Sequence, residues 1–230
     1  MIFLPIVLWY SVRMRITSLQ TQATNTERVN IFADGRFLMG ANALIVLQMG
    51  LRVGQELTEE QLEHLRHEES LQQTIDRVLN YLSFRPRSRQ EVRNYLRRKE
   101  TPPEMIETVL ARLDHMDLIN DRSFASFWVE TREQFNPKGS HALKSELRQK
   151  GVQREIVDEV VDDEQDEERA ERAARKKAAS LLHQPDLDYA TFYRRLGSFL
   201  QRRGFGYDVT SRTVKKLWEE LREEAADDLE

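Results

Sequence analysis

The chain has 230 residues, no cysteine, 32% charged residues and a formal net charge of −4. At about 150 residues per domain, this length allows one or two domains, or a small domain followed by a repeat array. The lack of cysteine excludes disulfides and thiolate chemistry and fits a cytoplasmic location. Because 35 basic residues nearly balance 39 acidic ones, a uniformly basic nucleic-acid coat is excluded, and only a local patch could contact phosphate.

The N-terminal run from Met1 to Tyr10 is almost entirely apolar. It is about half of the roughly 20 residues that span a bilayer, and no basic residue precedes it as in a secretory signal. We interpret residues 1–27 as a flexible leader, in which residues 1–13 come from an overlong start and Met14 is the alternative first residue. A membrane or signal role for this run is the competing interpretation.

Residues 28–70 predict a small module made of a β-hairpin and helices. Asp34-Gly35 stands between two apolar runs, and this dipeptide favours the tight hairpin turn in which both residues have positive φ. Asn42 is a helix-capping residue, and Gly50 ends the short helix that it opens. The pattern of Thr58 to Gln61 is a capping box, which predicts the start of the next helix.

From residue 71 onward, apolar residues recur every three or four positions, which predicts helices broken by proline and glycine. Ser88 precedes Glu91 by three residues, which is a capping box at one helix start. A repeat with offsets of 51 and 53 residues is visible: LRRK at 96–99, LRQK at 147–150 and LQRR at 200–203. This period is long enough for three helices, and stacked units of this kind bury a continuous core.

We predict helical repeats at 71–120, 121–164 and 165–225, followed by an acidic tail at 226–230. The fold class is therefore mainly α, with tandem three-helix repeats in an elongated, solenoid-like array after the β-hairpin module.

The motifs of these repeats are similar to those of a known family. They are YLSFRPRSRQEVRNYLRRK at 81–99, Pro137-Lys138-Gly139 with Lys150-Gly151, and Arg202-Arg203-Gly204-Phe205. In this order they resemble the RecX family, the regulatory proteins of the bacterial recombinase RecA. The resemblance implies a non-catalytic protein that binds RecA filaments on DNA. It also implies that this binding modulates, and mostly inhibits, recombinase, ATPase and co-protease activity in DNA repair and recombination.

Basic residues are concentrated between residues 85 and 99, a segment that contains seven basic residues and a single acidic one, Glu91. Arg89, Arg93 and Arg97 are spaced by four and share a helix face, which could bind phosphates or an acidic partner. The alternative is an ordinary solvated face. If the repeats stack regularly, cations of the later repeats extend this patch. The candidate partner-binding residues are Arg85, Arg87, Arg89, Arg93, Arg97, Arg98, Lys99, Lys138, Lys150, Arg202 and Arg203.

The sequence contains no phosphate-binding glycine loop and no His-Glu-x-x-His motif. His64 and His67 lie three apart on a predicted helix, where an exposed polar face explains them better than a metal site does. We therefore predict no catalytic residue, no cofactor and no metal. The expected partner is the RecA recombinase filament, with a monomeric chain and no membrane. Direct binding to DNA by a helical-repeat protein is the alternative function.

Overall fold

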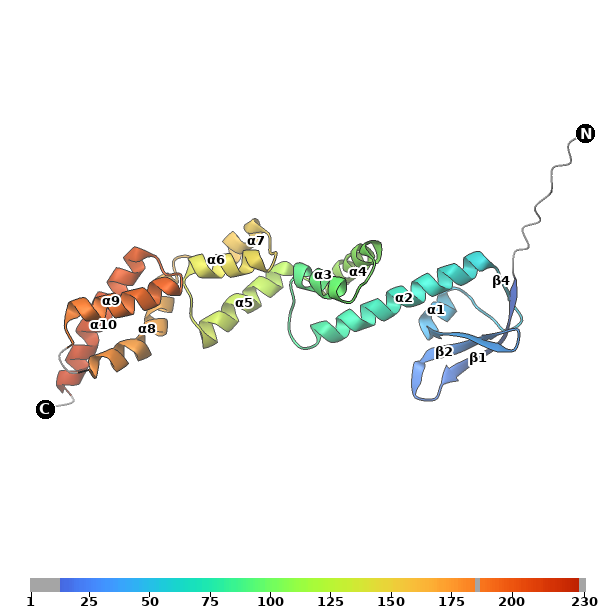
Figure 1. Ribbon diagram of the computed structural model, residues 1–230, viewed down its shortest axis with the longest axis horizontal. Coiled ribbons are helices and arrows are strands. Elements are labelled where there is room, and N and C mark those ends of the chain that lie inside the picture. Colours follow the sequence, from blue (N-terminus) through green and yellow to red (C-terminus); the bar gives the residue numbers. More distant parts are fainter. Residues whose placement is uncertain (1–12, 185–186, 228–230) are drawn as a thin grey trace, which may run out of the picture. The chain divides into compact units, whose positions relative to one another are not determined.

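The computed structural model describes residues 13–184 and 187–227, and it divides the chain into two compact units, Met1–Tyr81 and Leu82–Glu230 (Figure 1). Each unit is described by itself. The first unit contains a four-stranded antiparallel sheet in the order β3-β2-β1-β4. Its elements are β1 (Met14–Gln22), β2 (Asn25–Ala33), β3 (Arg36–Asn42), α1 (Ala43–Gln48), β4 (Glu56–Leu57) and α2 (Glu59–Leu82).

The local signals of this unit are confirmed. The β2–β3 turn has φ of 51° at Asp34 and 75° at Gly35, as the hairpin requires. The Asn42 side chain accepts a hydrogen bond from the backbone N–H of Leu44, and Gly50 has a φ of 61° just after α1. Both hydrogen bonds of the capping box between Thr58 and Gln61 are formed at the start of α2.

The prediction of a flexible leader is wrong for residues 14–27. Residues 14–22 form β1, which pairs with both β2 and β4. Ile16 is fully buried in the core of this unit, and Ile31 and Leu57 belong to the same core. The many threonines and glutamines of β1 suggested a loop, but such residues suit the exposed face of a strand whose other face is buried. The part of the leader at residues 1–12 lies outside the described residues.

Helix α2 runs unbroken through Ser70, so the predicted module boundary at 70/71 falls inside a helix. A buried carboxylate attaches α2 to the sheet. Glu69 is 3% exposed and accepts hydrogen bonds from the Arg28 guanidinium and from the backbone N–H of Asn42, both at 2.7 Å. Because a buried charge must be paired, these contacts constrain the angle at which α2 leaves the sheet.

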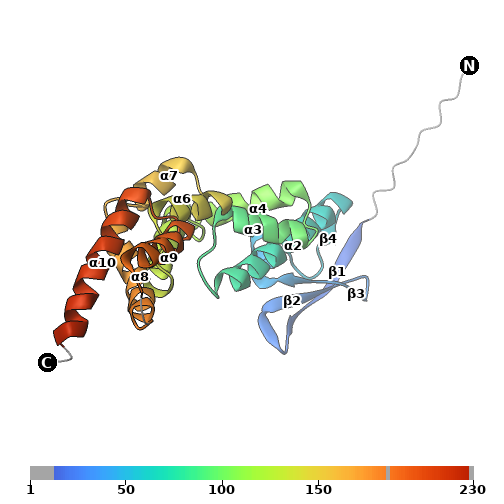
Figure 2. The ribbon, with the colours of Figure 1, turned by 60° about the vertical axis from the view of Figure 1, so that its left-hand side comes forward.

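The second unit is helical. Its helices are α3 (Arg89–Arg98), α4 (Pro103–His115), α5 (Asp121–Phe135), α6 (Ser140–Gln149), α7 (Arg154–Val160), α8 (Asp166–Leu182), α9 (Tyr189–Arg202) and α10 (Tyr207–Asp227). Helices α5 to α7 enclose one hydrophobic cluster, and α8 to α10 enclose another, which Figure 2 shows as a bundle. Helix α10 includes the first two residues of the predicted acidic tail, and residues 228–230 lie outside the described part.

Each repeat has a middle helix, which is α3 in the first repeat, α6 in the second and α9 in the third. The repeats join at two equivalent junctions, which we define as the contacts between the start of one middle helix and the end of the next. Ser88 Oγ, before α3, donates to the carbonyl of Lys150 at 2.7 Å, after α6. One repeat later, the backbone N–H of Gly139 donates to the carbonyl of Arg203 at 3.0 Å. The helices α3, α6 and α9 therefore follow one another in a regular array within this unit.

An aspartate of the following repeat completes each junction. The carboxylate of Asp121, at the start of α5, accepts from the first backbone N–H of α3 at 2.8 Å. Asp166, at the start of α8, does the same for the first N–H of α6, also at 2.8 Å. These N–H groups have no partner inside their own helices. Each middle helix thus obtains part of its N-terminal cap from the next repeat.

Glycine is required where the junctions bring two backbones together. Gly151 and Gly204 follow α6 and α9 with φ of 80° and 85°. A Cβ on Gly151 would lie 2.4 Å from Gln90 Cβ, and a Cβ on Gly204 would lie 2.4 Å from Ala142 Cβ. In the first repeat, Glu100 has the same position after α3 and a φ of 57°. A residue with a side chain can therefore adopt the left-handed conformation at this position. Glycine is required only where the neighbouring helix also approaches closely.

We expect Gly151→Ala and Gly204→Ala each to lower the free energy of unfolding by about 2 kcal/mol or more, because each adds left-handed strain and a steric overlap. Gly50→Ala is the matched control, since Gly50 also has positive φ but a Cβ added there would have nothing within 4 Å. Urea unfolding followed by circular dichroism measures all three. Equal losses in the three variants would contradict the role of close approach at the junctions.

Candidate partner-binding surface

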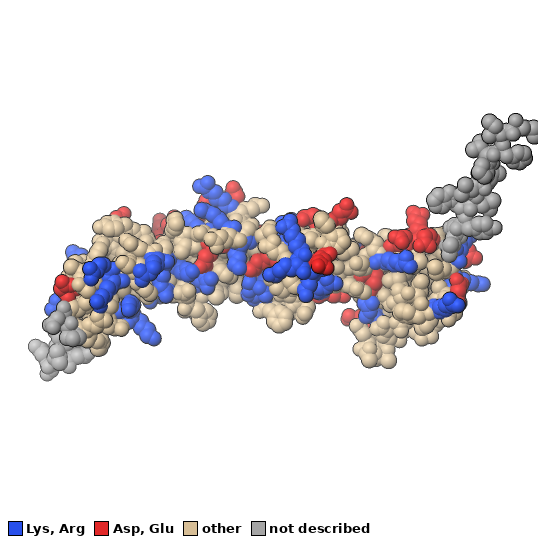
Figure 3. Space-filling view, viewed as in Figure 1, with Lys and Arg blue, Asp and Glu red and all other residues tan. Residues whose placement is uncertain are grey.

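The candidate cations fall into an exposed group and a paired group. The exposed group comprises Arg97, Arg98 and Lys99 at the end of α3 and Arg202 at the end of α9. Within the described residues, none of these four side chains makes an ion pair. Figure 3 shows Lys and Arg side chains on the visible face of the second unit, over α3, α6 and α9. The ends of the middle helices therefore offer positive charge that the fold itself does not neutralise.

Carboxylates of α4 occupy two of the three arginines that share a face of α3. Arg93 donates two hydrogen bonds to Glu107, at 3.1 and 3.0 Å, and Arg89 forms an ion pair with Asp114. The hydrogen bond from Arg93 lowers the pKa of Glu107, and the nearby charges of Arg89 and Arg97 add to this effect. Arg97 is thus the member of this stripe that remains available to a partner.

Arg85 and Lys150 lie at the first junction and share one carboxylate. Arg85 donates to both oxygens of Glu91, at 3.0 and 2.9 Å, and Lys150 Nζ donates to Glu91 Oε1 at 2.8 Å. Burial alone would raise the pKa of Glu91, but these hydrogen bonds and charges outweigh it and lower the pKa from 4.5 to about 2. Lys150 therefore links the second repeat to Glu91 of the first, Arg85 holds the same carboxylate within the first repeat, and neither cation is free for a partner.

Lys138 and Arg203 have comparable internal roles. Lys138 pairs with Glu146, which also accepts from Arg132 Nε and from Trp128 Nε1, both at 2.8 Å. Burial acts to raise the pKa of Glu146, but these donors together lower it. Arg203 donates to Asn136 Oδ1 at 2.6 Å and to the Pro137 carbonyl at 3.1 Å.

Sequence reasoning missed the carboxylates Glu91 and Glu146 as the partners of these cations. Glu91 and Lys150 are 59 residues apart, so no helical spacing indicates their contact. The spacing of eight between Lys138 and Glu146 crosses the start of α6 and is not a helix-face pattern either. For Glu91 and Lys150 the repeat register was the available signal, because it brings the end of one middle helix to the start of another.

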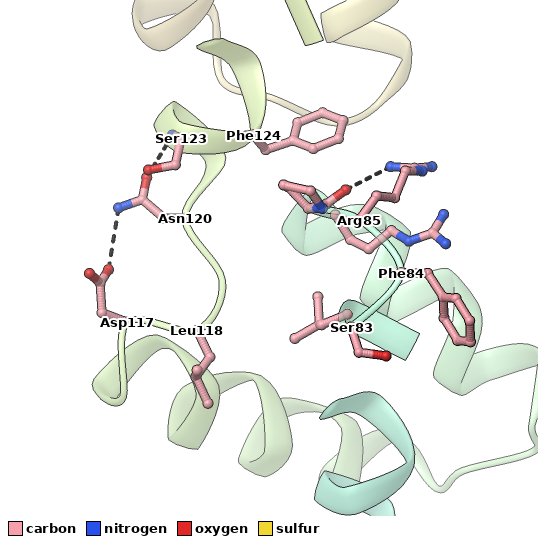
Figure 4. A pocket seen from close by; sticks show the side chains of 11 residues that line it. Ser83, Phe84, Arg85, Asp117, Leu118, Asn120, Ser123 and Phe124 are labelled. Atoms are coloured by element: carbon pink, nitrogen blue, oxygen red, sulfur yellow. Dashed lines mark hydrogen bonds between the residues drawn. The ribbon is translucent and has the colours of Figure 1, made fainter. Parts of the chain in front are cut away.

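Arg85 and Arg87 also line an open pocket of about 550 Å³ between the segment 82–87 and the segment 117–124 (Figure 4). Its opposite wall contains Asp117, whose carboxylate accepts from Asn120 at 3.3 Å. The Asn120 side chain in turn caps α5. These polar groups serve local structure, and the described residues contain no cluster of acidic or histidine side chains that could hold a metal ion.

No described helix is long and apolar enough to cross a bilayer. The fold and the surface define a class of protein: an array of three-helix repeats, preceded in the chain by a small β-sheet unit, with exposed cations at the ends of two helices. Models of the RecX family match four segments of the chain. They are the RecX N-terminal domain at 14–58 and the first, second and third RecX three-helix domains at 75–113, 120–161 and 163–214.

Known relatives agree with these matches. The chain is 32% identical over 202 residues to the regulatory protein RecX of Bacillus subtilis, covering 88% of this chain and 76% of the relative. It is 35% identical over 144 residues to that of Listeria monocytogenes, covering 63% of this chain and 54% of the relative. The chain belongs to the RecX family of regulatory proteins and is a non-catalytic regulator.

Solved structures show the same fold. A crystal structure of regulatory protein RecX superimposes with a TM-score of 0.73 and 26% identity, covering 87% of this chain and 98% of that one. A crystal structure of RecX from Lactobacillus salivarius gives a TM-score of 0.56 and 27% identity, covering 64% and 96%. The prediction of a mainly helical fold with three tandem three-helix domains is confirmed.

We expect Glu91→Gln to lower the melting temperature at pH 7 by roughly 5 °C, because it removes the shared partner of Arg85 and Lys150. The lowered pKa means that Glu91 stabilises the fold above pH 4.5 and loses this contribution as the pH falls toward 2. The variant should therefore lose less stability than the unaltered chain between pH 5 and pH 2.5.

Glu63→Gln is the control for this prediction, since it breaks an exposed ion pair with Arg66 on α2, outside the junctions. It should leave the melting temperature at pH 7 nearly unchanged. Thermal unfolding followed by circular dichroism at several pH values makes the comparison. Identical pH profiles for Glu91→Gln and the unaltered chain would show that this carboxylate does not support the junction.

Proposed function

We propose that the chain binds the RecA recombinase filament on DNA and reduces its recombinase, ATPase and co-protease activities. Membership of the RecX family supports this proposal. The observation that carries it is the exposed basic group at the ends of α3 and α9, which has no internal ion-pair partner among the described residues. A protein filament on DNA contains DNA phosphates, which are anionic groups that exposed cations at helix ends can bind.

The paired cations have a different role in this proposal. Arg85, Lys138, Lys150 and Arg203 set the geometry of the junctions, and Arg89 and Arg93 attach α3 to α4. Charge reversal at these positions would disturb the fold together with any binding. The contact residues are therefore Arg97, Arg98, Lys99 and Arg202, which lie at the same end of two middle helices.

Direct binding to DNA is the second candidate function, because the same exposed cations would attract phosphates in bare DNA. It differs from the first in requiring no recombinase. Affinity for bare single-stranded DNA that equals the affinity for coated DNA, with a steep dependence on salt, would favour it. Counterion release makes the salt dependence grow with the number of phosphates contacted.

We expect the triple variant Arg97→Glu, Arg98→Glu, Lys99→Glu to bind recombinase-coated single-stranded DNA about a hundredfold more weakly than the unaltered chain. Each substitution replaces a charge-assisted contact by repulsion, and the side chains are exposed, so the fold should persist. The readouts are fluorescence anisotropy of labelled coated DNA and suppression of ATP hydrolysis by the recombinase.

The matched control is Arg172→Glu, Lys176→Glu, Lys177→Glu on α8. These three cations are also exposed, and the substitution changes the net charge by the same amount. It should leave both readouts within about threefold of the unaltered chain, because its charges are not at the ends of the middle helices. Equal losses in both triple variants would indicate that net charge governs binding. Full activity in the α3 variant would rule out the end of α3 as the contact surface.

A further inference from the structure

Two phenylalanines occupy equivalent positions in consecutive repeats and are largely exposed. Phe84 is 76% exposed and Phe135 is 75% exposed. They are 51 residues apart, the same offset that separates Leu96 from Leu147 in the repeat. Each is followed by proline after one residue and by a basic residue after that, in Phe84-Arg85-Pro86-Arg87 and Phe135-Asn136-Pro137-Lys138. A single exposed apolar side chain is ordinary, but its recurrence in register calls for an explanation.

The structure holds both rings in the same setting. Each phenylalanine lies where the first helix of its repeat has ended or is ending, and the proline restricts the turn that follows. The residues at the next junction, Ser88 and Gly139, come four positions later and are anchored by hydrogen bonds to the following repeat. Figure 4 shows the Phe84 ring directed away from Phe124 and Asn120, the opposite side of the pocket that it borders.

The third repeat lacks this feature among its described residues. Its first helix, α8, ends at Leu182, which packs against the hydrophobic cluster of that repeat. An apolar residue at the end of the first helix can therefore be covered by its own repeat. Phe84 and Phe135 are not covered in this way, so packing within the repeat does not account for them.

The charges beside the rings indicate the kind of partner. Arg85, next to Phe84, is occupied by Glu91, and Lys138, after Phe135, is occupied by Glu146. A base-stacking site on single-stranded nucleic acid combines an aromatic ring with cations for the adjacent phosphate. Since these cations are already paired, the rings are better suited to apolar pockets on a protein, where aromatic side chains are frequent anchors.

We propose that Phe84 and Phe135 are anchors that insert into equivalent apolar pockets on neighbouring subunits of a protein polymer. Two identical anchors at one repeat's spacing match a partner that presents the same pocket more than once, which is the property of a polymer of identical subunits. The inference rests on the proposed function, in which that polymer is the recombinase filament. It adds an apolar contact to the electrostatic one at the ends of α3 and α9.

The test compares Phe84→Ala, Phe135→Ala and the double variant with the unaltered chain. We expect each single substitution to weaken binding to recombinase-coated single-stranded DNA about tenfold, and the double substitution about a hundredfold. Melting temperatures should not change, because both rings are exposed. Leu47→Ala is the control: Leu47 is 74% exposed but lies on α1, outside the repeats, and its loss should leave binding unchanged.

Each other outcome has a distinct meaning. An equal loss of affinity for bare single-stranded DNA would overturn the inference in favour of base stacking. Self-association of the unaltered chain in analytical ultracentrifugation, abolished in the double variant, would overturn it in favour of a second copy of this chain. Unchanged binding of the double variant to coated DNA would overturn the inference and leave the proposed function standing. Failure of the unaltered chain itself to bind coated DNA would overturn both.

Discussion

The close approach of consecutive middle helices is the constraint on which the second unit depends. At Gly151 and Gly204 the backbone comes so near to the preceding middle helix that no Cβ fits. The hydrogen bonds from Ser88 Oγ and from the backbone of Gly139 can reach across only because of this proximity. With helix ends this close, an aspartate from the following repeat can also cap the same helix start. Each junction thus joins the start of one middle helix, the end of the next and the first helix of the following repeat. Equivalent residues of successive repeats therefore have equivalent surroundings.

The first and third repeats depart from this pattern in their sequences. In the first repeat, Glu100 stands at the position of Gly151 and Gly204. This position requires a positive φ, but among the described residues no preceding middle helix approaches it. At the other end, α9 begins four residues earlier relative to its central leucine than α3 and α6 do. Its own Asp188 accepts from the backbone N–H of Thr191 at 2.8 Å, a cap of the kind that Ser88 gives α3 through the backbone N–H of Glu91.

Electrostatics at the junctions separates structural cations from cations that a partner can use. Glu91 and Glu146 each collect several donors, and these donors lower the pKa of both carboxyls although partial burial acts to raise it. Lys150 and Lys138 are consequently committed to the fold. The exposed cations beyond them, such as Arg98 and Arg202, have no such commitment within the described residues. In a highly charged chain, the charges that the fold leaves unpaired are therefore the ones we propose for recognition of a partner.

Local signals in the sequence were sufficient for much of the architecture. Asp34-Gly35, the cap at Asn42 and the capping boxes at Thr58 and Ser88 act through neighbours in the chain, and each is formed as predicted. The repeat was visible because a stacked array places the same demand on the same position each time. β1 was not visible, since its polar residues identify a strand only when Ile16 is seen to face the core that Ile31 and Leu57 also line.

The sequence by itself determined the three-helix repeats, the turns between them and the concentration of basic residues near α3. Those features depend on helical periodicity, backbone conformation and composition, which are properties of nearby residues. Only the tertiary structure decided which cations are available. Arg89 and Arg93 read as one stripe with Arg97, but carboxylates of α4 neutralise the first two. It also decided that Phe84 and Phe135 are exposed, although apolar residues at helix ends usually pack inward, as Leu182 does. Pairing and burial depend on residues far away in the chain, so no local pattern in the sequence could report them.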